Sequence, residues 1–407
     1  MNLLTKRLLI ALGFPSLLLI LGYVFRQQLL TQQHTSLAQI TYLPYLLAML
    51  GMLLSWGFKN ARDFYSLLTM MLGYAGLQYL LWHPAVDGNT TLLISGIYFL
   101  LPLNLVIHNL LSDRGILSSH GLWRLVITFL QVTIFFWFVR QPDYHLEHFF
   151  NYSPLDWPLY RFTPINFLGL VTLLSGLLLI GLQTYLHQSV LHAGRWAMLL
   201  SIFFALQHLQ TPWLSSLFFA IAILACLLAI ILNSYNLAYL DELTHLPTRR
   251  ALKQHMMNLG RRYTLAVVDI DFFKKINDNY GHDVGDQVLR MVAGQLRKVH
   301  GGGKAYRFGG EEFVIVFQSK DAGEAMLMLE SLRERIASEP FIQRSRLRPK
   351  NKPKKPRARA KVQRINVTVS IGVAEKSAHH DTAQDVLKTA DKKLYKAKKT
   401  GRNKVCA

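Results

Sequence analysis

The sequence predicts two units of different fold class: an all-α, polytopic membrane bundle at the N-terminus and an α+β domain at the C-terminus. Long apolar stretches recur from Leu8 to Tyr235, whereas strand and helix patterns alternate after that point. The charge is divided in the same way, because residues 1–235 contain 10 basic and 6 acidic residues and residues 236–407 contain 35 and 18. With 51% hydrophobic residues, the composition also excludes a disordered chain.

Eight apolar stretches of about 16–23 residues predict eight transmembrane helices in residues 1–235, because a helix needs roughly 20 apolar residues to cross a bilayer. They cover residues 8–25, 41–58, 64–82, 91–111, 122–139, 165–186, 195–210 and 213–235. Lys6 and Arg7 before the first stretch are also typical of a signal peptide, but no small-residue cleavage site follows. The last two stretches are separated only by Thr211 and Pro212, so seven spans are the alternative.

The basic residues in the short loops predict the orientation, because cytoplasmic loops are enriched in Lys and Arg. With a cytoplasmic N-terminus, the inside loops hold Lys6, Arg7, Lys59, Arg62, Arg114 and Arg195, and the outside loops hold Arg26, Arg140 and Arg161. An even number of spans then leaves residues 236–407 in the cytoplasm.

Two features of the apolar half leave alternatives open. Histidines in or beside the spans are either haem or metal ligands or neutral side chains hydrogen-bonded within the bundle; they are His83, His108, His187, His192 and His208. The aromatic residues Tyr152, Trp157 and Tyr160 lie in the loop from Arg140 to Pro164 and fit an interfacial position better than a ligand-sensing surface. The two cysteines, Cys226 and Cys406, are too few for a disulfide framework.

The C-terminal half shows the pattern of a βαββαβ domain. We expect a helix to about Leu259, strands at 264–270, 304–308, 313–317 and 366–373, and helices at 284–299, 322–338 and 382–400. This order is typical of a ferredoxin-like core, an antiparallel sheet with helices on one face. Residues 344–364 interrupt the pattern with 11 basic and no acidic residues, and form either a solvated loop or a contact with anionic lipid headgroups.

Three segments of this half concentrate residues suited to phosphate chemistry. The first runs from Asp269 to Asp278, off the end of the first strand, where carboxylates need a cation to offset their burial and suit Mg²⁺. The second, from Arg307 to Phe313, is a glycine hairpin with two glutamates, which is also consistent with a plain turn. The third, from Asp391 to Asn403, is a basic helix end that holds phosphate only if the fold brings it beside the first two segments.

Together these residues resemble the GGDEF domain of the diguanylate cyclase family. The signature is Gly-Gly-Glu-Glu-Phe at residues 309–313. Four further motifs match in order: residues 241–250, with Thr248 where Asn is usual, then 269–286, 369–373 and 401–403. The resemblance covers roughly 165 residues and does not reach the membrane half. It implies a nucleotidyl cyclase-like fold and, with the predicted spans, a multi-pass protein of the bacterial cytoplasmic (inner) membrane.

The resemblance implies that two GTP molecules are condensed to cyclic di-GMP and pyrophosphate by a homodimer, each subunit holding one GTP and two Mg²⁺ (or Mn²⁺) ions. The metal ligands would be Asp269, Glu311 and the Ile270 carbonyl, and Glu311 or Glu312 would assist deprotonation of the attacking 3′-hydroxyl. The substrate would be bound by Asn277, His282 and Asp286 at the base, by Lys274, Lys398 and Arg402 at the phosphates, and at Gly310, where the hairpin lets a ligand approach.

Two other readings compete with an active enzyme. The soluble half could bind nucleotide as a scaffold, although every catalytic position of the signature is filled here. A nucleic-acid partner is suggested by a net charge of +17 in residues 236–407, but no nucleic-acid motif accompanies it. The family's product-inhibition motif, Arg-x-x-Asp, is replaced by His300 and Gly303, so we expect no product site there.

Overall fold

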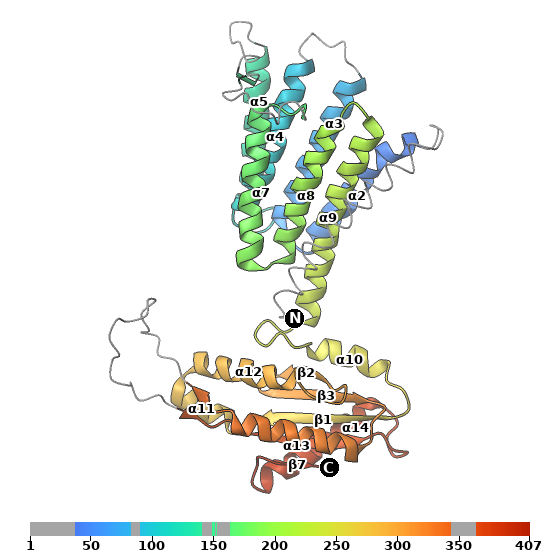
Figure 1. Ribbon diagram of the computed structural model, residues 1–407, viewed down its shortest axis with the longest axis vertical. Coiled ribbons are helices and arrows are strands. Elements are labelled where there is room, and N and C mark those ends of the chain that lie inside the picture. The colour runs from blue at the N-terminus through green and yellow to red at the C-terminus, as the bar shows by residue number, and fades with distance from the viewer. Residues whose placement is uncertain (1–36, 83–89, 141–148, 151, 153–162, 343–363) are drawn as a thin grey trace, which may run out of the picture. The chain divides into compact units, whose positions relative to one another are not determined.

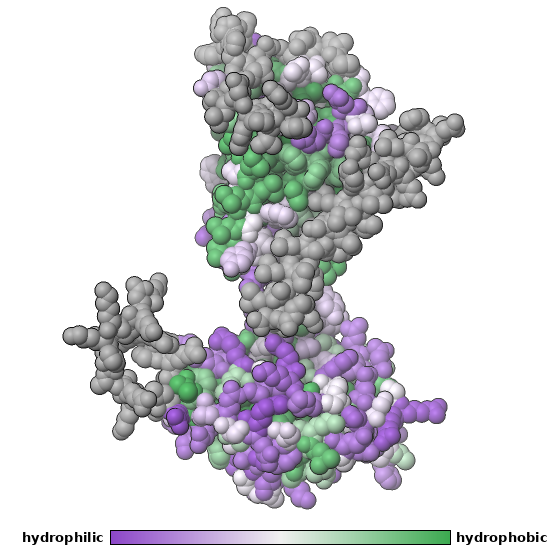
Figure 2. Space-filling model, viewed as in Figure 1, coloured by the Kyte–Doolittle hydropathy of each residue, from purple (hydrophilic) through white to green (hydrophobic). Residues whose placement is uncertain are grey.

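The computed structural model describes residues 37–82, 90–140, 149–150, 152, 163–342 and 364–407. The chain divides into two compact units, residues 1–234 (the helical unit) and residues 235–407 (the C-terminal unit). The surface of the helical unit in Figure 2 is mainly hydrophobic, and that of the C-terminal unit is mainly hydrophilic. This contrast follows the division of charge in the sequence.

The helical unit is built from long helices (Figure 1). After a 3₁₀ turn at Leu37–Tyr42, these are α2 (Leu43–Gly57), α3 (Ala61–Trp82), α4 (Thr90–Leu110), α5 (Ser119–Val139), α7 (Phe167–His187), α8 (Val190–Gln207) and α9 (Pro212–Tyr239). Six candidate spans in the described residues are long and apolar enough to cross a membrane: Ile40–Gly57 and the helices α4, α5, α7, α8 and α9.

The predicted spans that fall on described residues all form helices, with one difference in character. The helix α3 occupies the predicted stretch 64–82 but is not among the six, because it begins with Arg62 and Asp63 and carries further polar side chains. The predicted stretch 8–25 lies outside the described residues, so the count of eight spans stays a prediction. The helices α8 and α9 are distinct, with a break at residues 208–211.

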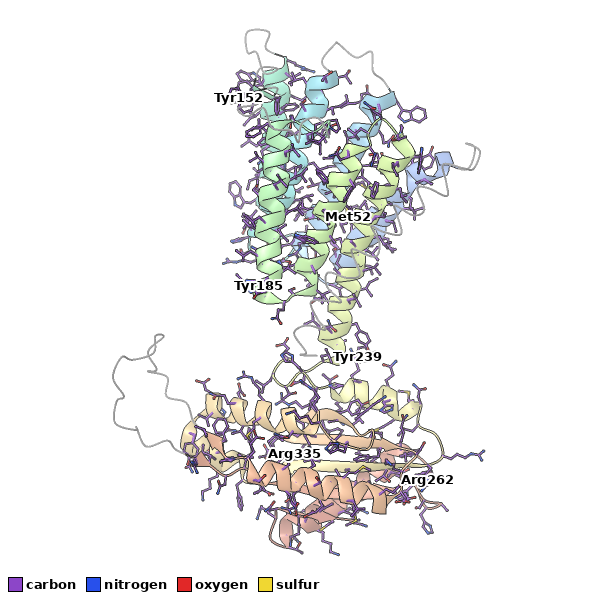
Figure 3. All side chains as sticks on the ribbon, viewed as in Figure 1. Met52, Tyr152, Tyr185, Tyr239, Arg262 and Arg335 are labelled. Atoms are coloured by element: carbon purple, nitrogen blue, oxygen red, sulfur yellow. The ribbon has the colours of Figure 1, made fainter. Side chains whose placement is uncertain are left out.

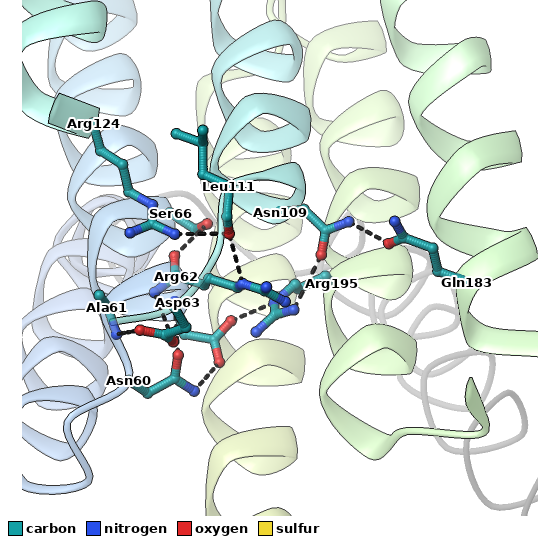
Figure 4. Close-up of polar contacts among 11 residues, drawn as sticks. Asn60, Ala61, Arg62, Asp63, Ser66, Asn109, Leu111, Arg124, Gln183 and Arg195 are labelled. Carbon is teal, nitrogen blue, oxygen red and sulfur yellow. Dashed lines mark hydrogen bonds and ion pairs between the residues drawn. The ribbon is translucent and has the colours of Figure 1, made fainter. Parts of the chain in front are cut away.

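A buried polar cluster connects four helices at one end of the helical unit (Figure 4). Arg195 of α8 donates to Asp63 of α3 and to Asn109 of α4, over 2.6 and 3.0 Å. Asn109 in turn donates to the Oε1 atom of Gln183 in α7, over 2.5 Å. Nearby, Arg124 of α5 donates to the Leu111 carbonyl, which is left free by the end of α4. The Asp63, Asn109 and Arg195 side chains thus pair with one another, whereas the Nε and Nη1 atoms of Arg124 have no partner among the described residues.

The C-terminal unit contains the predicted ferredoxin-like core (Figure 1). Its strands are β1 (Tyr263–Ile270), β2 (Lys304–Gly309), β3 (Glu312–Gln318), β6 (Val369–Glu375) and β7 (Val405–Cys406), in the order β2-β3-β1-β6-β7. Its helices are α10 (Arg249–Met257), α11 (Phe273–Tyr280), α12 (His282–Leu296), α13 (Ala322–Ser338) and α14 (Ala383–Lys399). The first four strands pair antiparallel, and β7 adds a short parallel edge. A two-stranded ribbon, β4 (Phe341–Ile342) with β5 (Arg364–Ile365), lies beside the gap at residues 343–363.

The expectation of helices on one face of the sheet is wrong, because helices cover both faces. Alternate residues of β1, such as Val268, pack with α12 and α13, whereas the residues between them, such as Val267, pack with α10 and α14. Gly372 permits the approach of α14, since a Cβ atom there would lie 2.1 Å from the Ala390 carbonyl oxygen. At Gly372, strand β6 therefore has no side chain to keep α14 away from the sheet.

A second difference lies directly after β1, where we expected no helix or strand. Residues 273–280 form the short helix α11, with Phe273 and Ile276 buried and Lys274 exposed. At eight residues the apolar period is too short to distinguish a helix from a loop. The consequence is that Asn277 is held on a helix rather than on a loop.

Candidate active site

Three carboxylates converge where β1 ends beside the glycine hairpin. Asp269 is directly opposite Glu312 in the register of β1 and β3, and Glu311 precedes Glu312 at the hairpin turn. The Asp269 side chain is almost fully buried, whereas the two glutamates are half-buried. The strand pairing therefore sets Asp269 opposite Glu312, and Glu311 is the adjacent residue along the chain at the hairpin turn.

The negative charge at this point is in excess. Burial raises the pKa of Asp269, and the nearby Lys398 opposes that rise. Burial and the charge of Asp269 also raise the pKa of both Glu311 and Glu312. A carboxylate cluster with raised pKa values is one that a cation stabilises.

Lys398 supplies one cation to the cluster. Its Nζ atom lies 2.8 Å from the Oδ2 atom of Asp269. The residue is near the end of α14, almost 130 positions after Asp269, and it reaches the cluster because α14 packs on β6 and β1. This satisfies the condition under which the basic helix end becomes part of the site.

The donor set fits a divalent cation. Carboxylate oxygens are hard ligands, and the pKa values of Asp269 and Glu311 are raised first by burial, a cost that a bound cation would offset. Within the described residues, no three His, Cys, Asp or Glu side chains are grouped closely enough to hold a metal by themselves. Asp269, Glu311 and the Ile270 carbonyl would thus hold a cation together with water and phosphate oxygens.

The residues expected to read the base lie on α11 and α12. Gly285 of α12 makes room for the Asn277 side chain, since a Cβ atom at Gly285 would be 1.9 Å from the Asn277 Oδ1 atom. That oxygen is buried and has no hydrogen-bond partner in the described part of the chain. Asp286 is half-buried in the first turns of α12. An unsatisfied amide beside a half-buried carboxylate is suited to the polar edge of a ligand.

Two of the predicted substrate-binding residues lie apart from the carboxylate cluster. Lys274 on α11 and His282 at the start of α12 are exposed. Among the residues that the structure describes, neither makes a contact with the carboxylate cluster. Gly310 lies at the hairpin turn, with a φ of 47° that favours glycine.

Asp271 is a site residue that the sequence reading missed. Its buried carboxylate accepts hydrogen bonds from the hydroxyls of Thr368 and Ser370 and from the Asn403 backbone N–H, over 2.8, 2.6 and 3.0 Å. The bond from Asn403 holds the turn that follows α14. In this turn the Arg402 guanidinium lies 4.3 Å from the centre of the Phe272 ring. The signal in the sequence was the pair of polar residues at 368 and 370.

Arg307 is a second residue of the site for which the sequence analysis predicted no role. Its Nη1 atom donates to the Oδ1 atom of Asp241 over 2.8 Å, and its Nε and Nη2 atoms donate to the Gly310 carbonyl over 3.2 and 2.8 Å. The backbone N–H and the hydroxyl of Thr244 donate to the same Asp241 oxygen, and these bonds lower the Asp241 pKa against the effect of burial. Arg307 thereby connects the glycine hairpin to the turn at residues 241–244.

Comparison with known proteins agrees with this arrangement. The family model described as "Diguanylate cyclase, GGDEF domain" matches residues 238–404. Response regulator PleD of Caulobacter vibrioides is 37% identical over 182 residues, which are 42% of this chain and 37% of that protein. Diguanylate cyclase A of Treponema denticola is 32% identical over 196 residues, which are 45% of this chain and 48% of that protein. The chain thus spans less than half the length of each of these relatives.

Solved structures match the same part of the chain. A structure of the coiled coil and GGDEF domain of DgcB from Caulobacter crescentus, in complex with cyclic di-GMP, is 31% identical and covers 44% of this chain and 89% of its own, with a TM-score of 0.37. The active GGEEF domain of a diguanylate cyclase from Vibrio cholerae is 30% identical and covers 39% and 88%, with a TM-score of 0.30. The family match and the identities of these relatives thus identify residues 238–404 as a GGDEF domain whose homologues are diguanylate cyclases.

Proposed function

We propose that this protein is a membrane-bound diguanylate cyclase that condenses two GTP molecules into cyclic di-GMP and releases two pyrophosphates. The observation that carries the proposal is the cluster of Asp269, Glu311 and Glu312 around the end of β1, with Lys398 bound to it. Phosphoryl transfer needs positioned oxygens and positive charge rather than a covalent nucleophile. This cluster provides both.

The residues divide the chemistry between them. A divalent cation, Mg²⁺ or Mn²⁺ and two per site, supplies charge stabilisation at the transferring phosphoryl group when bound. Glu311 or Glu312 accepts the proton of the 3′-hydroxyl, a role that suits a carboxylate whose pKa is raised towards the working pH. Lys398 and Arg402 hold phosphate oxygens, and the exposed Lys274 joins them when the nucleotide is bound.

Selectivity for guanine is assigned to the residues on α11 and α12. The Asn277 amide can donate to and accept from the base edge, and the Asp286 carboxylate accepts from N–H groups, which guanine presents at N1 and N2. His282 lies exposed at the start of the same helix. We expect an Asp286→Asn variant to lose discrimination against ATP.

The reaction also requires a second subunit. Each 3′-hydroxyl must attack the α-phosphate of the other nucleotide, and one site holds one GTP. A homodimer that brings two C-terminal units face to face therefore forms the working enzyme. This arrangement gives a membrane region a simple means of control, because any change in the pairing of the units changes the activity.

The location follows from the helical unit. Six helices long and apolar enough to cross a membrane support a location in the bacterial cytoplasmic membrane. The proposal puts the C-terminal unit in the cytoplasm, where GTP is available. Reporter fusions after residues 31, 88 and 150 should report the outside, and fusions after 60 and 118 the inside. The inverted pattern would contradict the proposal.

The basic segment 344–364, apart from Arg364, lies outside the described residues. Its contact with anionic lipid is tested by vesicle binding with and without residues 349–361.

The decisive experiment uses the full-length protein in membranes with GTP and Mg²⁺. The wild type should form cyclic di-GMP, and Glu311→Gln should abolish it. The control is Glu334→Gln, a change of the same kind at an exposed residue of α13, which should leave turnover unaltered. Retained binding of GTP without product formation in the wild type would instead favour the scaffold.

A further inference from the structure

The helical unit contains a cavity of about 490 Å³ at the end opposite the Asp63–Arg195 cluster. Five separate parts of the chain form it: the end of α3, the first turns of α4, Phe150 with Tyr152, residues 163–167 at the start of α7, and the connection between α8 and α9. Ligand cavities in proteins have volumes in the range of about 300–1,000 Å³ and occur between helices of bundles. The volume and the position are therefore those of a small-molecule site.

The cavity has hydrogen-bonding groups that the described protein does not use. Tyr98 is 5% exposed and Ser95 is 8% exposed, and neither hydroxyl has a hydrogen-bond partner in the described part of the chain. The side-chain amide of Gln207, at the end of α8, is also without a partner among the described residues. Buried polar groups are normally paired, so unpaired ones around a cavity indicate a bound molecule or water.

The remaining lining decides the class of ligand. Of the fifteen lining residues that the structure describes, none is Asp, Glu, Lys, Arg or His. These residues therefore offer an ion no compensating charge for the large free energy cost of leaving water. Phe150, Tyr152 and Phe167 instead offer ring faces and edges, which suit an apolar or aromatic body.

We infer that this cavity is a binding site for an uncharged small molecule with an aromatic or apolar body and at least one hydrogen-bonding group. The Tyr98 hydroxyl and the Gln207 amide select that group, and the rings hold the body. On the predicted orientation the cavity is at the outer end of the helical unit. The inference concerns binding and is independent of the cyclase activity.

The test uses three probes of the same shape and different charge: 2-naphthamide, 2-naphthoate and 2-naphthamidine. Each is titrated at millimolar concentration against full-length protein in lipid nanodiscs, by ligand-observed NMR, with empty nanodiscs subtracted. The neutral amide should bind, and both charged probes should bind at least about tenfold more weakly. No binding of the amide, or equal binding of all three probes, would overturn the inference.

Two variants locate the site. Thr91→Trp fills the cavity from an exposed position of α4 and should abolish binding of the amide. Tyr98→Phe should weaken it by about three- to tenfold through the loss of one hydrogen bond. The matched control is Tyr185→Phe, at an exposed tyrosine that Figure 3 shows at the opposite end of the unit from Tyr152. Amide binding that survives both cavity variants shows another site and refutes this one.

Discussion

The Nε atom of Arg195 lies 2.6 Å from the Oδ1 atom of Asp63, and both side chains are almost inaccessible to solvent. The pair joins the start of α8 to the start of α3, two helices that are 132 residues apart along the chain at this contact. Removing one partner of a buried pair leaves the other charge uncompensated, which is far more costly than removing both. The pair therefore fixes the register of α3 against α8.

Replacing one member of this pair should lower the free energy of unfolding of the protein. We expect Arg195→Met or Asp63→Leu to lower the stability of the full-length protein by about 3–5 kcal/mol, whereas the double variant Asp63→Leu/Arg195→Met recovers part of the loss. Thermal unfolding in detergent measures both effects. Arg114→Met, at an exposed arginine, is the control and should be neutral. A loss in the double variant equal to the sum of the two single losses would show that the two residues are not coupled.

Arg307 is expected to act on catalysis through the hairpin, which it holds by the Gly310 carbonyl while it is bound to Asp241. Lysine retains the charge but cannot make these bonds together. Arg307→Lys should therefore lower kcat by about 10- to 100-fold with little change in GTP binding. Steady-state kinetics with a filter-binding assay separates the two. Arg262→Lys, at an exposed ion pair with Asp321, should leave both unchanged.

A matched pair of glycines tests the packing of α14 on the sheet. Gly372→Ala would place a Cβ atom 2.1 Å from the Ala390 carbonyl oxygen and the Leu394 nitrogen, and we expect a loss of about 1–3 kcal/mol or more. Gly294→Ala, in the interior of α12, has no atom within 4 Å of the new Cβ and should gain about 0.5–1 kcal/mol. Urea unfolding of the C-terminal transition gives both values. A neutral Gly372→Ala would show that α14 can move away without cost.

The binding of a divalent cation should weaken as the pH falls. The folded unit holds the protons of Glu311 and Glu312 more tightly than the unfolded chain, because its pKa values lie above the ordinary 4.5. Without the cation, these groups therefore reduce stability as the pH rises through the window from about 4.5 to the raised values. Protons compete with the cation, so the increase in Tm caused by Mg²⁺ should be largest at neutral pH and vanish as the pH falls through that window. In Glu311→Gln/Glu312→Gln the increase should be small throughout.

Turnover is expected to continue without strong product inhibition at residues 300–303. Gly303 has no side chain, and the ring of Phe317 occupies the space beside it, while His300 lies 3.5 Å from Arg335. Progress curves with added cyclic di-GMP should be linear for the wild type. Strong inhibition that is unchanged in His300→Arg/Gly303→Asp would reveal a product site elsewhere.

The sequence predicted the order of strands in the C-terminal unit because long apolar runs and glycine turns are local signals. The grouping of Asp269 with Glu311 and Glu312 was implied by the resemblance to the GGDEF family, and the pairing of β1 with β3 sets Asp269 opposite Glu312. It could not place α14 on the second face of the sheet, since that depends on the fit of Gly372 under a distant helix. The role of Asp271 was hidden for the same reason, because its partners lie about 100 residues away.

The edge of the sheet at β2 has a consequence for the handling of the protein. The N–H group of Arg307 in this edge strand donates to the Pro247 carbonyl, and Thr248 forms an isolated bridge with Arg307. An uncovered edge strand is a template for pairing with other molecules and hence for aggregation. A shortened protein that begins after Thr248 would leave this edge bare and self-associate in solution, whereas one that begins before Tyr239 would keep its protective cover.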